Sequence, residues 1–183
     1  MQWHRLPIEK NDEGVPEIHY SSVFRIFQRW VINGSIESAF IGTVASLAKA
    51  DKLDMSILHG DGSVTEAKKG GELLGYTGHK HRKGEKVVAI CDRNVNVITP
   101  FVRVEANKNE TPLFKRALGS LKTVCKKVSL CIKNVIMSLD TGYDSKENRK
   151  HIFNAGMTPN IPENKRNRKG VKKGRPRIYD KGV

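Results

Sequence analysis

Apolar residues in the first fifty positions recur with the spacing of an amphipathic helix, in two blocks separated by Asn33-Gly34. The first stripe consists of Val23, Phe27, Trp30 and Val31, and the second of Ile36, Phe40, Val44 and Leu47. Ser22 and Ser35 stand where N-caps are expected. The pattern therefore predicts two helices joined by a tight turn. A DNA-binding helix-turn-helix and a plain helical hairpin both fit it, and neither helix has a clear basic face.

Beyond Asp54 the apolar residues gather in short β-branched runs. These runs predict strands at 57–62, 86–91, 97–104, 132–139 and 158–161, the second and third forming a hairpin. Helical spacing predicts helices from about 111 to 127 and from 145 to 155, while the segment 65–82, rich in glycine and lysine, predicts a loop. The order strand, hairpin, helix, strand, helix, strand predicts an α/β fold built on a mixed sheet.

The charge of the chain is strongly positive and unevenly placed. Its 183 residues include 33 Lys and Arg against 19 Asp and Glu, for a formal net charge of +14. Residues 146–183 hold 12 Lys and Arg and 3 acids, so that +9 of this excess lies in the last fifth of the chain. Such an excess favours a polyanionic partner, nucleic acid ahead of an anionic membrane surface.

Other features of the composition exclude several classes of protein. The three cysteines form no C-x-x-C pair, which argues against a disulfide framework or a cysteine zinc site and fits a reducing cytosol. The sequence shows no secretory signal at its start and no apolar run long enough to cross a bilayer. We therefore expect a cytoplasmic protein without a membrane partner.

The densest positive charge falls between residues 165 and 177. It comprises Lys165, Arg166, Arg168, Lys169, Lys172, Lys173, Arg175 and Arg177. This basic segment has too few apolar residues to fold alone. One interpretation is contact with DNA phosphates, which would make affinity fall steeply with salt, and Gly174-Arg175-Pro176 resembles the core of minor-groove AT-hook segments. The other interpretation is a solvated tail that aids solubility.

Two acids follow apolar strand runs and precede glycines. Asp61 lies before Gly62, and Asp140 lies two residues before Gly142. The carboxyl ends of strands in α/β sheets face the crevice where ligands collect, so neighbouring strands would bring both carboxylates to one place. Mg²⁺ is held by one or two protein carboxylates, and paired ions promote cleavage of phosphodiesters. Asp is also common in turns and caps, so a purely structural role stays open.

Two further clusters have weaker signals. His79 and His81 lie two residues apart in a basic stretch; they suit a transition metal, a phosphate-facing loop or a solvated loop, and no third metal ligand is near them in the sequence. Asp144 and Ser145 stand before the predicted helix 145–155, where either would cap it.

Several segments resemble bacterial insertion-sequence DDE transposases. Gly60-Asp61-Gly62-Ser63 is similar to the first-aspartate segment of that family, and Asp140-Thr141-Gly142-Tyr143-Asp144-Ser145 to its second-aspartate motif, Asp-x-Gly-Tyr-Asp-Ser. Ile161-Pro162 followed by basic residues resembles the usual sequel, and Trp3-His4-Arg5-Leu6-Pro7 the helical region before the catalytic core. The resemblance spans nearly the whole chain, in the order of the family.

The resemblance implies a ribonuclease-H-like mixed sheet with flanking helices. Residues 1–52 would form a helical N-terminal region able to bind DNA, 53–163 a partial catalytic domain, and 164–183 a flexible basic tail. In the family two Asp and one Glu bind Mg²⁺ or Mn²⁺ for DNA cleavage and strand transfer. Asp61 and Asp140 match the two catalytic, metal-binding aspartates, whereas Glu147 and Glu163 lie too close to Asp140 to match the Glu.

The family's Glu is expected beyond Val183, so the chain resembles a transposase shortened at its C-terminus and also at its N-terminus. We therefore expect it to bind double-stranded DNA, at transposon ends and target, and to be inactive alone. Its protein partner would be a second copy of the chain or a full-length transposase. The alternative is a non-catalytic DNA-binding product that competes with or inhibits the full-length enzyme.

Overall fold

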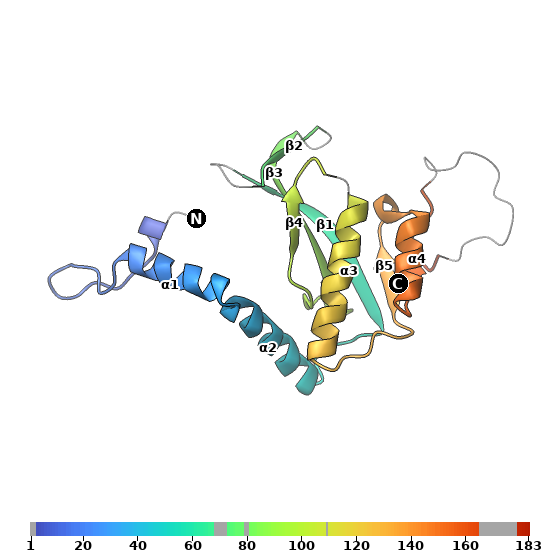
Figure 1. The fold of residues 1–183 in the computed structure, drawn as a ribbon, viewed down its shortest axis with the longest axis horizontal. Helices are drawn as coiled ribbons and strands as arrows, with labels where there is room; N and C mark the ends of the chain where they lie inside the picture. Colours follow the sequence, from blue (N-terminus) through green and yellow to red (C-terminus); the bar gives the residue numbers. More distant parts are fainter. Residues whose placement is uncertain (1–2, 68–72, 79–80, 109, 165–178) are drawn as a thin grey trace, which may run out of the picture. The chain divides into compact units, whose positions relative to one another are not determined.

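A computed structural model describes residues 3–67, 73–78, 81–108, 110–164 and 179–183 of the protein. The chain divides into two compact units, Met1–Thr43 and Val44–Val183, and Figure 1 shows their elements. His79 and the eight cations of the basic segment lie outside the described residues.

Both helices predicted near the N-terminus are present, as α1 (Tyr20–Ile32) and α2 (Ser35–Lys49), preceded by the short helix η1 (Trp3–Arg5). The first unit ends at Thr43, so the last residues of α2 belong to the second unit. The ring of Trp3 packs on Phe24 and Phe27 of α1, at centroid distances of 5.2 and 5.3 Å. Each helix begins earlier than its serine predicts. His19 caps α1 in place of Ser22, because its side chain accepts the amide of Ser21, and Ser35 is itself the first residue of α2.

Among the described residues, no single helix has the length and apolar character needed to cross a membrane. Helices α1 and α2 meet that requirement only when they are taken together, by length and composition, with a bend of 69° between them.

The second unit contains a six-stranded mixed sheet. Its strands are β1 (Ile57–Glu66), β2 (Gly75–Thr77), β3 (Arg82–Cys91), β4 (Val102–Glu105), β5 (Ile136–Leu139) and β6 (Thr158–Asn160). Strand β3 pairs antiparallel with β1 on one side and with β2 and β4 on the other. On the far side of β1, β5 and then β6 run parallel to it. The predicted α/β class, with a ribonuclease-H-like mixed sheet and flanking helices, is confirmed.

Two helices, α3 (Glu110–Lys127) and α4 (Lys146–Asn154), lie side by side in front of the strands in Figure 1. The core forms between them and the sheet. Its buried members on α3 include Leu113, Phe114, Ala117, Leu121 and Val124, and those on the sheet include Leu58, Val88, Ile90 and Met137. Helical spacing predicted Leu113, Ala117, Leu121 and Val124 as the apolar stripe of this helix, and all four are buried; Phe114 was not part of that prediction. Together these residues exclude water from one face of the sheet.

The expected loop 65–82 is partly strand. Strand β1 continues to Glu66 and pairs with β3 as far as Gly84, so the two form a long antiparallel ladder. The polar residues of this part lack the alternation that predicts a strand, and the ladder of backbone hydrogen bonds holds it instead. Gly84 permits the close pairing, because a Cβ there would overlap the backbone of Thr65.

Substitution of Gly84 by alanine should destabilise the protein, because the new methyl group meets main-chain atoms that cannot rotate away. Overpacking of this kind costs about 1–3 kcal/mol, which lowers the melting temperature by roughly 2–12 °C in a domain of this size. Gly119→Ala is the matched control, since Gly119 lies in α3 with open space around it, and alanine favours a helix. Thermal unfolding followed by circular dichroism should show a loss in the first variant only; equal melting temperatures would contradict this packing.

The cysteines differ in burial and should differ in reactivity. Cys125 is buried and Cys131 exposed. Burial, and next the neighbouring Cys131, raise the pKa of the Cys125 thiol to about 11. Because only the thiolate is alkylated, iodoacetamide at pH 8 should modify Cys131 long before Cys125, and the Cys125 rate should rise as the pH approaches 11. Mass spectrometry of tryptic peptides measures both rates. Equal labelling of the two thiols in the folded protein at pH 8 would show that Cys125 is not buried.

Candidate functional site

Asp61 and Asp140 lie on neighbouring parallel strands. The printed register of β1 and β5 ends with Gly60 opposite Leu139, so that the two aspartates are the next residues along. Neighbouring strands lie about 4.8 Å apart, which puts the two Cα atoms at a comparable separation. The sequence predicted that both acids end their strands. This is wrong for Asp61, which stands within β1 opposite Ala89 of β3, while Asp140 does follow the last residue of β5.

Both side chains leave the sheet on the side away from α3. Gly60 faces the core, since a Cβ there would lie 2.6 Å from Cδ2 of Leu139 and 3.7 Å from Phe114. Side chains alternate along a strand, so Asp61 projects to the opposite face. Asp140 has an extended backbone, φ −74° and ψ 173°, and therefore continues the alternation after the buried Leu139. The two carboxylates share one exposed face of the sheet.

Each carboxylate accepts one backbone hydrogen bond, through a single oxygen. Oδ1 of Asp61 accepts the amide of Gly62 at 2.7 Å, and Oδ1 of Asp140 accepts that of Gly142 at 2.8 Å. Within the described part of the chain, Oδ2 of either aspartate accepts no hydrogen bond, which leaves one carboxylate oxygen on each for a ligand. No cluster of three or more His, Cys, Asp or Glu side chains able to hold a metal occurs among the described residues.

Residues that the sequence did not single out share this face with Asp61. His59 stands two positions before it on β1, and the ladder pairs His59 with Cys91 on one side and Ser138 on the other. Burial, and next the negative charge of Asp92, raise the pKa of the Cys91 thiol; Asp61 adds a smaller contribution of the same sign. The i, i+2 spacing of His59 and Asp61 was the available signal, because such residues line one face of a strand.

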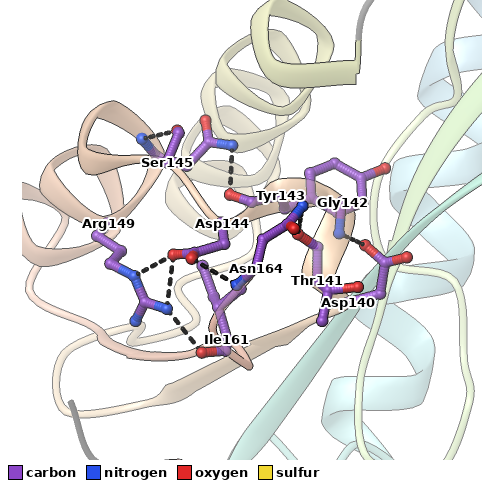
Figure 2. Close-up of polar contacts among 10 residues, drawn as sticks. Asp140, Thr141, Gly142, Tyr143, Asp144, Ser145, Arg149, Ile161 and Asn164 are labelled. Atoms are coloured by element: carbon purple, nitrogen blue, oxygen red, sulfur yellow. Dashed lines mark hydrogen bonds and ion pairs between the residues drawn. The ribbon is translucent and has the colours of Figure 1, made fainter. Parts of the chain in front are cut away.

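The loop after Asp140 forms the short helix η2 (Thr141–Tyr143), which Asp140 caps. Tyr143 anchors it in the core, where its ring packs edge-on against Phe114 at 5.8 Å. Ser145 caps α4 by accepting the amide of Asn148, as its place in the sequence predicted. Asp144 does not share that role: it forms an ion pair with Arg149, at 2.9 Å (Figure 2).

The remaining predicted clusters lie partly or wholly outside the described residues. His81 is described, and its ring hydrogen-bonds the hydroxyl of Tyr76 at 3.1 Å, but its companion His79 is not. The basic segment from Lys165 to Arg177 is also outside them, whereas the residues before and after it are described. The amide of Asn164 donates to Asp144, and Asp180 exchanges two hydrogen bonds with Asn160 at the end of β6.

The second unit is thus a mixed α/β domain with acids at matching positions of two adjoining parallel strands, Asp61 within β1 and Asp140 directly after β5. The model of one protein family, the transposase DDE domain, matches residues 52–182. The chain therefore belongs to the DDE transposase family. This confirms the resemblance found in the sequence.

Solved structures with similar folds include transposases. A piggyBac transposase synaptic complex with hairpin DNA is 16% identical, with a TM-score of 0.47, over 68% of this chain and 27% of that one. The catalytic domain of Mos1 mariner transposase is 12% identical, with a TM-score of 0.41, over 66% and 56% respectively. A second structure of that domain, with raltegravir and Mn, has a TM-score of 0.42, again at 12% identity over 66% and 56%. The chain thus spans between about a quarter and little over half of these proteins. No curated protein matches it.

Proposed function

We propose that this chain acts in DNA transposition by binding transposon DNA and holding a divalent cation between Asp61 and Asp140. The observation that carries the proposal is the position of these two acids. They occupy equivalent places on β1 and β5, project from one exposed face and each keep an oxygen without a hydrogen bond from the described residues. Membership of the DDE transposase family supports the same function.

The donor set suits Mg²⁺ or Mn²⁺. Both ions prefer oxygen ligands, and Mg²⁺ is commonly held by one or two carboxylates with water and phosphate oxygens completing its shell. When bound, such an ion activates an attacking oxygen and stabilises the leaving oxygen of a phosphodiester. In this proposal Asp61 and Asp140 supply the carboxylates, and the hydrogen bonds from Gly62 and Gly142 orient them.

DNA would reach this face through positive charge. The basic segment begins directly after Asn164, whose side-chain amide hydrogen-bonds the carbonyl of Thr141, the residue that follows Asp140. Its cations are Lys165, Arg166, Arg168, Lys169, Lys172, Lys173, Arg175 and Arg177. We propose that they contact phosphates without regard to base sequence, so that affinity falls steeply as salt rises. A cytoplasmic location, where double-stranded DNA is accessible in a bacterium, follows from this role.

The described residues supply two carboxylates at the site, and no third acid joins them. Catalysis requires the ions and the attacking oxygen to be held in line, and small misplacements cost about a hundredfold in rate. We therefore propose that the chain alone cleaves DNA poorly and works beside a second copy or a longer transposase. The same observation favours a second candidate function, that of a DNA-binding product that competes with full-length enzyme.

Gel-shift and nicking assays on supercoiled DNA carrying the element end, with Mg²⁺ or Mn²⁺, test this proposal. We expect tight binding at low salt with little or no nicking. Absence of DNA binding at low salt would refute the DNA-binding role. Robust nicking that disappears in Asp140→Ala would show that a third ligand is present in the assembly and would exclude the non-catalytic alternative.

A further inference from the structure

The loop that carries Asp140 is tied to a distant part of the chain through a buried carboxylate. Oδ1 of Asp144 accepts a hydrogen bond from Nε of Arg149 at 2.9 Å, and Nη2 of the same guanidinium lies 2.9 Å from it as an ion pair. Oδ2 of Asp144 accepts a hydrogen bond from the backbone amide of Asn164 at 2.9 Å. Nη2 of Arg149 also donates to the carbonyl of Ile161 at 2.6 Å. Figure 2 shows these contacts as one connected set, here called the Asp144 network.

The Asp144 network also includes a contact with Thr141, the residue that follows Asp140. The side-chain amide of Asn164 donates to the carbonyl of Thr141 at 3.4 Å. Asn164, which follows β6 in the chain, is therefore hydrogen-bonded both to the first residue of η2 and to its C-cap, Asp144. Asp140 in turn accepts the amide of Gly142, the middle residue of η2. The position of η2 therefore sets the direction of the Asp140 carboxylate.

The ion pair is largely buried, since the exposed fraction of the side chain is 13% for Arg149 and 3% for Asp144. A buried ion pair is weak evidence for a gain in stability, because desolvation offsets the attraction, and well-packed apolar residues often serve as well. What an ionised pair provides here is geometry. A planar guanidinium fork and a two-oxygen carboxylate fix three chain segments, α4, η2 and 161–164, in defined directions.

We propose that Asp144 and Arg149 are positioning residues for the cation site. They hold η2 so that Asp140 presents its oxygen beside Asp61. This inference rests on the proposed function, since it concerns the same cation. Outer hydrogen-bond partners of metal ligands commonly change metal affinity about 10- to 100-fold when replaced. The Asp144 network acts one residue further away, so we expect a smaller effect, of about 3- to 10-fold.

The test measures Mn²⁺ affinity by titration calorimetry in Asp144→Asn and Arg149→Lys, at a temperature where every variant is folded. The first change places an amide donor against the donating Asn164 N–H, and the second cannot serve Asp144 and Ile161 together. Asn164→Ala keeps the backbone amide that Asp144 accepts and loses the side-chain bond to Thr141, so it provides a milder variant that should fold. Hydrogen exchange of the Gly142 amide reports on the Asp140 loop itself, independently of metal.

Val124→Ala is the control, because Val124 is buried on α3, ten residues from the Phe114 that touches Tyr143, so its effect is on stability alone. In the network variants we expect weaker Mn²⁺ binding and faster hydrogen exchange of the Gly142 amide. In Val124→Ala we expect neither change, even if its melting temperature falls as much as those of the network variants. Wild-type Mn²⁺ affinity in the network variants, while Asp140→Asn loses binding, would overturn this inference alone. An equal loss in Val124→Ala would also overturn it. Failure of the wild-type chain to bind Mn²⁺ would overturn the proposed function.

Discussion

Replacement of Asp140 by asparagine should abolish measurable Mn²⁺ and Mg²⁺ binding. The amide keeps the shape of the side chain and can still accept the amide of Gly142, so the fold should be preserved. It carries no charge, however, and offers one weaker ligand oxygen. We expect a loss of about 100-fold or more in affinity, equivalent to roughly 2.7 kcal/mol, and the same result for Asp61→Asn. Titration calorimetry at constant ionic strength measures it.

The control for this experiment is Glu66→Gln, which removes one exposed carboxylate from the far end of the same strand. That variant should bind Mn²⁺ as the wild type does, with an unchanged melting temperature. If Asp140→Asn and Glu66→Gln bind Mn²⁺ equally well, the cation does not bind at Asp140, whose role is then that of the N-cap of η2.

Neutralising the eight cations between Lys165 and Arg177 to glutamine should remove most of the affinity for duplex DNA, whatever its sequence. Each contacted phosphate contributes about 0.9 to the slope of log affinity against log salt. If half of the eight contact phosphates, the slope should fall by about 3.6, and affinity at low salt by several powers of ten. Substitution is preferable to ending the chain after Asn164, because truncation would also remove the Asp180 that pairs with Asn160.

A matched control neutralises four exposed cations of α3, namely Lys115, Arg116, Lys122 and Lys126. The salt dependence of binding, measured by fluorescence anisotropy with a labelled duplex, should change little in this control. An unchanged slope in the variant of the basic segment would show that the segment is not the contact surface. The helical first unit, with Arg25 and Arg29 on α1, would then become the better candidate.

Much of the fold was predictable because its signals are local. The apolar stripe of α3 and the N-cap Ser145 are set by residues within a few positions, and both are present as predicted. Strands β5 and β6 were predicted from β-branched and apolar runs, although β5 begins at Ile136 and not at residue 132 as predicted. The polar end of β1 was missed, because its pairing with β3 and not its own sequence pattern holds it in the sheet. Gly84 permits that pairing through its close approach to Thr65, a contact between residues far apart in the sequence.

In the candidate site, too, local signals predicted some residues, whereas contacts between distant residues were missed. Asp61 and Asp140 were proposed from their places beside apolar runs and from a resemblance to the motifs of the family to which the match over residues 52–182 assigns the chain. The sequence placed Asp144 at a helix cap, which is the common local role of Asp. Its actual partners are Arg149, five residues on, and Asn164, twenty residues on. A contact of the second kind is decided by how the chain returns after β6, which no local pattern encodes.

The most direct test of the central claim is a crystal structure of the chain soaked with Mn²⁺ and measured for anomalous scattering. The account predicts a Mn²⁺ peak bound by one carboxylate oxygen of Asp61 and one of Asp140, at bond lengths slightly above the roughly 2.0–2.1 Å of Mg²⁺. Carboxylates more than about 10 Å apart, or a peak at other residues, would contradict it, since two ligands of one ion lie within about twice a bond length of each other.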